Sequence, residues 1–191
     1  MKTKDTIEMN RTNRLDFQRM KSLLACASKD PTRSIINKVL VKKAAAGVTI
    51  TATDGRRMRI DHFMIEAAAG IYDIKVNSGS GIFLMRNKEK LTFPKTEQVI
   101  PSLDPQDAYA LKGMGSRFVI WASSALGCML SPDLIALSDD EGVTLYVQKK
   151  QPDLSPAVMK NDETLFLLMP VRTAEEDWGR QLEQIRTAKA A

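Results

Sequence analysis

Apolar residues near the beginning of the chain recur every three to four positions, which is the spacing of one helix face. They are Phe17, Met20, Leu23, Leu24 and Ala27. Asp16 stands where its side chain can cap the first turn, and Asp30-Pro31 ends the pattern. We therefore predict an amphipathic helix of about three turns, which follows a polar arm over residues 1–13.

Shorter segments with alternating apolar and polar residues come next, as expected for half-buried β-strands. Val48, Ile50 and Ala52, for example, alternate with three threonines. The dipeptide Asp54-Gly55 that follows them is typical of a hairpin turn. The pattern predicts strands over residues 36–42, 48–53, 58–64, 71–76, 82–86, 117–121, 143–148, 157–160 and 164–169.

The strand predicted over residues 58–64 has two different faces. One face carries Met58, Ile60, His62 and Met64, and the other carries Arg57, Arg59 and Asp61. We expect the first set to face the core because it is the more apolar. His62 is then a packed core-side residue rather than a catalyst.

The second half of the chain repeats the order of the first at the level of elements. Ser131-Pro132-Asp133 predicts a short helix, capped by serine and with proline at its first position. We therefore predict an α+β protein whose two helix-plus-antiparallel-sheet halves, residues 1–104 and 105–172, form one compact domain. Residues 173–191 add a C-terminal amphipathic helix, with an apolar stripe of Trp178, Leu182 and Ile185.

Length and composition are those of a globular protein that can bury a substantial core: 191 residues, 43% hydrophobic and 27% charged. No segment approaches the roughly 18 consecutive apolar residues of a membrane span, and no secretory signal is visible. Cys26 and Cys128 sit in apolar surroundings without metal-ligand spacing, so we expect two reduced core cysteines. These features predict a cytoplasmic protein without a membrane partner.

Positive charge is concentrated in the first third of the chain. Residues 1–60 hold 14 Lys or Arg against 5 Asp or Glu, a balance of +9, and residues 61–191 hold 14 against 18, a balance of −4. The exposed face of the first helix contributes Arg19, Lys21 and Lys29 and carries no acid. Such a face either contacts nucleic-acid phosphates or is simply solvated.

No set of catalytic residues assembles from the sequence. The single histidine, His62, is too little for most metal or triad chemistry, and Ser123-Ser124 lacks the context of a nucleophile elbow. We predict no metal, no cofactor and no enzymatic activity. An enzyme would be recognised by an acidic cluster that binds a divalent metal.

Five stretches, in their order along the chain, resemble the bacterial sliding clamps, the beta subunit of DNA polymerase III. Residues 52–58 are similar to the family's Ala-Thr-Asp-Gly-His-Arg-Leu, and residues 93–101 to its Phe-Pro-x5-Ile/Leu-Pro domain junction. Residues 168–172 are similar to its closing Met-Pro-Met/Val-Arg motif, and residues 15–40 and 154–158 resemble its middle and last domains. The resemblance implies a DNA-clamp fold.

In the family, the turn after Thr-Asp-Gly, the domain junction and the closing strand build a hydrophobic pocket for short linear peptides of polymerases and clamp loaders. The resemblance implies that such peptides are the partners here, and that a groove is lined by Gly55, Arg56, Arg57, Met58, Pro94, Gln98, Val99, Leu167, Met169, Pro170, Val171 and Arg172. An apolar concave site with flexible methionines suits an anchored peptide.

Clamps also place helices around double-stranded DNA. The resemblance therefore makes Arg14, Arg19, Lys21 and Lys29 candidate phosphate contacts. The family's protomer is about twice as long as this chain, so closing a ring would need a homo-oligomer of several copies. The alternative is a clamp-like adaptor or regulator of replication proteins that does not encircle DNA. We expect the C-terminal helix, which starts close to Met169, to pack beside the groove.

Overall fold

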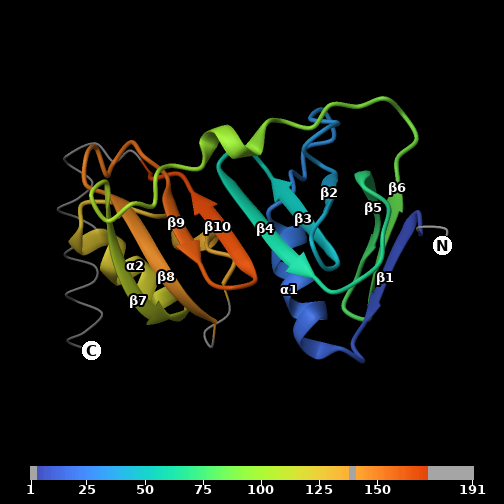
Figure 1. The fold of residues 1–191 in the computed structure, drawn as a ribbon, viewed down its shortest axis with the longest axis horizontal. Helices are drawn as coiled ribbons and strands as arrows, with labels where there is room; N and C mark the ends of the chain where they lie inside the picture. The colour runs from blue at the N-terminus through green and yellow to red at the C-terminus, as the bar shows by residue number, and fades with distance from the viewer. Residues whose placement is uncertain (1–3, 138–140, 172–191) are drawn as a thin grey trace.

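The computed structural model describes residues 4–137 and 141–171, which form two α-helices and ten β-strands (Figure 1). The helices are α1 (Arg14–Ala25) and α2 (Gly115–Ala125). The strands are β1 (Thr6–Asn10), β2 (Val39–Lys43), β3 (Val48–Thr53), β4 (Arg57–Phe63), β5 (Gly70–Asn77), β6 (Gly81–Arg86), β7 (Ala108–Met114), β8 (Gly142–Gln148), β9 (Ala157–Lys160) and β10 (Thr164–Leu168). Short 3-10 turns occur at Thr96–Val99 and Pro132–Leu134.

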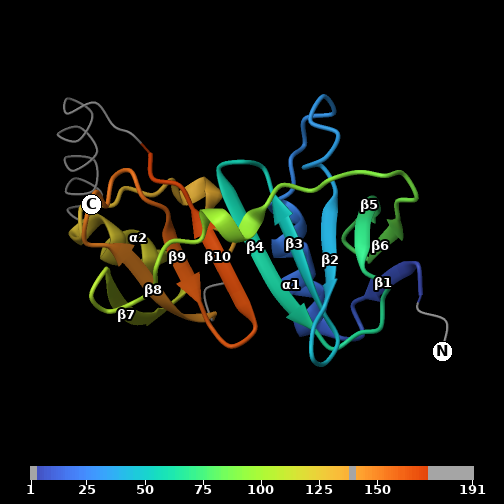
Figure 2. The same ribbon diagram turned by 45° about the horizontal axis from the view of Figure 1, so that its top comes forward.

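All ten strands belong to one antiparallel sheet with the order β1-β6-β5-β2-β3-β4-β10-β9-β8-β7. The first six strands along this order come from the first half of the chain and the other four from the second half. The two halves join where β4 pairs with β10, with Met58 opposite Leu167. Strands far apart in the sequence therefore lie side by side at the centre of the molecule (Figures 1 and 2).

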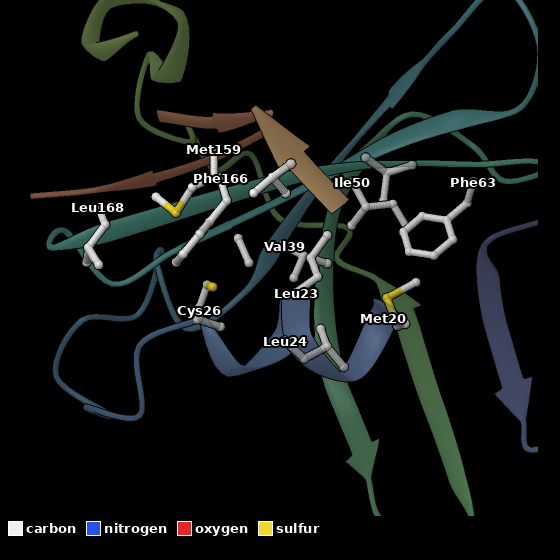
Figure 3. Close-up of a cluster of buried hydrophobic side chains, with 14 of the residues drawn as sticks. Met20, Leu23, Leu24, Cys26, Val39, Ile50, Phe63, Met159, Phe166 and Leu168 are labelled. Carbon is white, nitrogen blue, oxygen red and sulfur yellow. The ribbon is translucent and has the colours of Figure 1, made fainter. Parts of the chain in front are cut away.

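Both helices cover the same face of this sheet and share one hydrophobic core with it. Helix α1 packs on β3 and β4, and α2 packs on β7 and β8. Figure 3 shows the centre of this core, where Met20 and Leu23 of α1 meet Val39 and Ile50 of the sheet, near Phe166 of β10. The core thus runs continuously across the junction between the halves.

Helix α1 differs from its prediction at both ends. Its cap is Asn13, whose side chain accepts a hydrogen bond from the backbone N–H of Asp16, and it ends at Ala25. Asp16 is therefore a first-turn acid, where a negative charge is favourable, and not the cap. Lys29 lies beyond the helix.

Helix α2 was predicted as a strand over residues 117–121, and that prediction is wrong. The helix begins directly after β7 at Gly115, whose φ of +72° is costly for other residues. Val119 and Ala122 point into the core one turn apart. The short helix predicted at Ser131 is a single 3-10 turn.

The face of β4 that packs on the helices is the opposite of the one predicted. Arg59, Asp61 and Phe63 are buried on that side, whereas Met58 lies in a second cluster on the other face of the sheet. The two charges are tolerated because they pair with each other, with Nε of Arg59 2.9 Å from Oδ2 of Asp61. His62 is only half-buried, beside the carbonyl of Ala46.

The other face of the sheet carries the outer cluster, which consists of Met58, Val158 and Leu167 with Ile60, Ile100, Leu103, Tyr146 and Leu165 around them. Ile100 and Leu103 belong to the linker between β6 and β7, which crosses the molecule from one half to the other (Figure 1). This crossing places the linker beside β4 and β10. The predicted C-terminal helix, residues 173–191, lies outside the described residues.

Candidate peptide-binding groove

A pocket of about 330 Å³ lies where the β3–β4 turn, the linker and the end of β10 meet. We call it the groove. It is lined by Ile36, Thr53, Gly55, Arg56, Arg57, Met58, Pro94, Lys95, Thr96, Val99, Pro156, Leu167 and Met169. Seven of these thirteen residues are isoleucine, methionine, proline, valine or leucine, and the surface that they line is mostly apolar.

The first wall is the turn between β3 and β4, and Asp54 fixes its shape. Its Oδ1 accepts hydrogen bonds from the backbone N–H groups of Arg56 and Arg57 at 2.9 and 3.0 Å. Gly55 takes a φ of +89°, which glycine adopts without steric cost. The side chain of Arg56 then stands exposed at the rim.

Arg57 lines the same wall, but its guanidinium is committed to the protein itself. Nε lies 3.0 Å from Oδ2 of Asp54, and the Nη atoms donate to the carbonyls of Leu134 and Ala25 at 3.0 and 2.6 Å. These bonds tie the turn to the end of α1 and to the loop after α2. Arg57 therefore positions the wall, and its charge is neutralised by Asp54.

The second wall is the linker, where Pro94 leads into the 3-10 turn Thr96–Val99. Lys42 of β2 pairs with Glu97 and so holds this turn against the sheet. The hydrogen bond from Lys42 holds the pKa of Glu97 below its ordinary value, which keeps the carboxylate charged. Gln98 is exposed and does not line the groove.

The third wall is the end of β10. Leu167 is buried in the outer cluster against Met58, whereas Met169 leaves 43% of its surface exposed at the mouth of the groove. The backbone N–H of Met169 donates to the carbonyl of Arg56 at 2.9 Å, which fastens this wall to the first. Two methionines thus face the space, and their flexible thioethers adapt to irregular partners.

The structure brings eight of the twelve predicted groove residues together: Gly55, Arg56, Arg57, Met58, Pro94, Val99, Leu167 and Met169. Gln98, Pro170 and Val171 do not line the pocket, and Arg172 lies outside the described residues. Five lining residues were not named from the sequence: Ile36, Thr53, Lys95, Thr96 and Pro156. All five lie within or next to the stretches that carry the clamp resemblance, so the same signal could have identified them.

The rim of the groove carries uncompensated positive charge. Arg56 and Lys95 are both exposed, and neither side chain makes a hydrogen bond or ion pair with any residue in the described ranges. No Asp or Glu is among the residues that line the groove. The site therefore combines an apolar floor with two free cations.

The four candidate DNA contacts fall into two groups. Arg14 and Lys29 are exposed, whereas Arg19 and Lys21 are bound within the protein. The guanidinium of Arg19 lies 2.7 Å from Glu163, donates to the carbonyl of His62 at 2.6 Å and stacks over the ring of Phe63. Nζ of Lys21 donates to the carbonyl of Ser78 at 3.1 Å.

The described residues contain no group of three or more His, Cys, Asp or Glu side chains that could hold a metal ion. Cys26 and Cys128 are free and buried, as predicted, and burial raises the pKa of each thiol to about 12. A buried thiol with a raised pKa is a poor nucleophile. Within residues 4–137 and 141–171, no helix is long and apolar enough to cross a membrane.

Searches of protein-family models and of curated proteins match nothing. Solved structures do match. The DNA polymerase III beta subunit of Thermotoga maritima aligns with a TM-score of 0.59 and 13% identity, over 91% of this chain and 67% of that one. The beta subunit of Borrelia burgdorferi, in complex with a natural product, aligns with a TM-score of 0.56 and 9% identity, over 91% and 64% of the two chains.

A third structure is the sliding clamp of Pseudomonas aeruginosa bound to griselimycin, with a TM-score of 0.56 and 13% identity, over 91% of this chain and 67% of the clamp. At these identities the likeness is one of fold. This chain spans about two thirds of the length of each clamp.

Proposed function

Because this chain has the fold of the bacterial DNA sliding clamps in a shortened form, we propose that it is a non-enzymatic accessory protein of bacterial or phage DNA replication. It acts in the cytoplasm and binds short linear peptides of polymerase or clamp-loader type in the groove. The observation that carries this proposal is the groove itself, an apolar pocket assembled from three segments that are far apart in the sequence.

The size and lining of the groove suit a peptide anchor. Its volume of about 330 Å³ is at the small end of ligand pockets, enough for one or two large apolar side chains. Met58, Leu167 and Met169 supply adaptable apolar contacts for such an anchor. Buried apolar anchors of this kind carry most of the free energy in peptide and protein interfaces.

The rim adds a preference for acidic peptides. Arg56 and Lys95 present two cations without a partner among the described residues, so an Asp or Glu next to the apolar anchor gains a favourable interaction. Charges at a rim act mainly on the association rate and on specificity. Affinity for an acidic peptide should therefore fall as the salt concentration rises.

Binding is tested by calorimetric titration with griselimycin and with a clamp-binding peptide of a bacterial polymerase. We expect saturable binding to the wild type and a loss of at least about fivefold in the double variant Met169→Ala/Pro170→Ala, since apolar anchors are typically worth more than about 1 kcal/mol. Met85→Ala, a partly exposed methionine of β6 outside the groove, is the matched control. Equal affinities in all three proteins reject the groove as the binding site.

A second candidate function is an adaptor that binds replication proteins without encircling DNA. The internal contacts of Arg19 and Lys21 favour it, because a phosphate would have to displace partners that each side chain already has. Only Arg14 and Lys29 of the four candidate cations are free to meet a duplex. Sequence-independent binding to DNA becomes weaker when fewer free cations can neutralise phosphates.

Assembly separates the two candidates. Among the residues that the structure describes, β1 and β7 form the two edges of the sheet, and head-to-tail pairing of such edges between copies generates a closed ring when the rotation closes. Size-exclusion chromatography with light scattering, combined with retention on circular and linear DNA, is the test. An oligomer retained only on circular DNA supports the ring, and a monomer that releases both DNAs supports the adaptor.

A further inference from the structure

The outward face of α2 carries an apolar stripe that no described residue covers. Trp121 leaves 71% of its surface exposed and Met114, which precedes the helix, 61%. Ala125 is exposed on the same side, one turn after Trp121. The single charge on the stripe is Arg117.

This stripe is a poor surface for DNA. Proteins that follow a duplex without reading its sequence neutralise phosphates with Lys and Arg, and α2 offers one such residue. A large exposed tryptophan beside an exposed methionine is instead typical of a surface that contacts protein. A protein segment is therefore the better candidate for what covers the stripe.

The described chain ends next to this helix. The backbone N–H of Val171 donates to the carbonyl of Met129 at 2.8 Å, and Met129 belongs to the loop that follows α2. The remaining residues, 172–191, therefore begin at the C-terminal end of α2. Their sequence predicts an amphipathic helix whose apolar stripe is Trp178, Leu182 and Ile185.

We propose that residues 173–189 form a helix that packs antiparallel to α2 and covers its exposed stripe within the same chain. A helix that starts at the C-terminal end of α2 can follow α2 only toward its N-terminal end. On α2 the exposed stripe runs from Arg117 through Trp121 to Ala125, and on the predicted helix it runs from Trp178 through Leu182 to Ile185. At 1.5 Å per residue the two spans are about 12 Å and about 10.5 Å, so they match in length.

In this arrangement Trp178 lies between Ala125 and Trp121, and Ile185 lies near Met114. Leu182 falls between them. In this arrangement the segment docks on α2. The expectation from the sequence, based on how close residue 173 is to Met169, is instead that it packs beside the groove. Peptide binding and tail docking then use different surfaces.

The chain contains two tryptophans, which allows a direct spectroscopic test. In the variant Trp178→Phe, Trp121 is the only tryptophan. We expect its emission maximum to lie at shorter wavelength, and its quenching by acrylamide to be weaker, than in the same variant truncated after Val171. Identical spectra in the two proteins overturn the proposal.

A full-length pair of variants guards against truncation simply unfolding the protein. Leu182→Asp in the Trp178→Phe background places a charge on the apolar stripe and should shift the emission of Trp121 to the truncated value. Thr187→Asp places the same charge on the opposite side of the predicted helix and should leave the emission unchanged. Equal effects of the two substitutions overturn the proposal, provided that circular dichroism shows both proteins folded.

Concentration dependence distinguishes the tail from a second copy of the chain. If the segment docks within its own chain, the emission maximum of Trp121 does not depend on protein concentration. The protein in which Trp121 is shielded from acrylamide then has the mass of a monomer. A shift that disappears on dilution shows that another copy covers the stripe and overturns docking within the chain. The affinity of the groove for its peptide should be the same with and without residues 172–191.

Discussion

Replacement of Arg59 by methionine tests how the two halves of the sheet are held together. The guanidinium of Arg59 is fully buried on β4 and lies 2.9 Å from the carboxylate of Asp61 and 3.0 Å from that of Glu141. It also donates to the carbonyl of Ala136 and, at 3.4 Å, to Oγ1 of Thr164 on β10. One side chain thus links β4, β10 and the loop that precedes β8.

The expected loss of stability follows from the carboxylate that the substitution leaves unpaired. Methionine fills a similar volume, but the carboxylate of Asp61 is then buried without its cation, which costs about 3–5 kcal/mol in comparable buried pairs. For a chain of this length, 1 kcal/mol corresponds to a shift in Tm of about 2–4 °C. We therefore expect Tm to fall by about 6–20 °C.

Thermal unfolding followed by circular dichroism is the assay. The control is Lys42→Met, which removes the cation of an exposed pair with Glu97 and should change Tm little. Adding Asp61→Leu to Arg59→Met should recover much of the loss, because no fully buried carboxylate is then left unpaired. A shift for Arg59→Met no larger than that for Lys42→Met would refute the reasoning.

Three further predictions concern other parts of the molecule. Both cysteines, whose thiol pKa values are raised by burial to about 12, should react with a thiol reagent only in denaturant, and rapid labelling of the native protein would contradict their burial. Burial raises the pKa of Asp73, but hydrogen bonds from Lys38 and Asn87 outweigh burial and hold it below its ordinary value of 3.8. Its charge therefore stabilises the fold above that pH, so the difference in unfolding free energy between wild type and Asp73→Asn should narrow as the pH falls below 3.8; a constant difference would count against this. Arg14→Gln/Lys29→Gln should weaken any DNA retention and lower the slope of log affinity against log salt by about two, and an unchanged slope would exclude these side chains as phosphate contacts.

Periodicity located elements whose two faces differ in polarity. It found α1 from the repeat of Phe17 and Met20, and it found β3 with its observed bounds. It missed α2 because Phe118-Val119-Ile120-Trp121 consists of β-branched and aromatic residues, which favour a strand locally. Packing of Val119 on the sheet overrides that preference, and no local pattern reports it.

For β4, alternation separated the two faces correctly, but the prediction that the face with Met58 meets the main core was wrong. Both faces are covered, one by the helices and the other by the linker, so apolar residues occur on both. Arg59 and Asp61 face the helices because they neutralise each other there. Such pairing depends on contacts with Glu141 and Ala136, which are distant in the sequence.

The groove was predictable where a sequence stretch itself forms a wall, as at Gly55 to Met58. It was not predictable where the chain turns away, as at Val171, which leaves the groove to bond Met129. The residues predicted to contact DNA show the same limit. Helical spacing placed Arg19 on an exposed face, but the structure engages it with Glu163 and Phe63.

The central claim, that the groove binds a peptide, is tested most directly by the methyl resonances of the methionines. With ε-methyl-labelled methionine, titration with the polymerase peptide should shift the signals of Met58 and Met169, which line the groove. The signals of Met20, on the buried face of α1, and of Met85 on β6 should stay in place. Shifts confined to methionines outside the groove, or none at saturating peptide, would contradict the account.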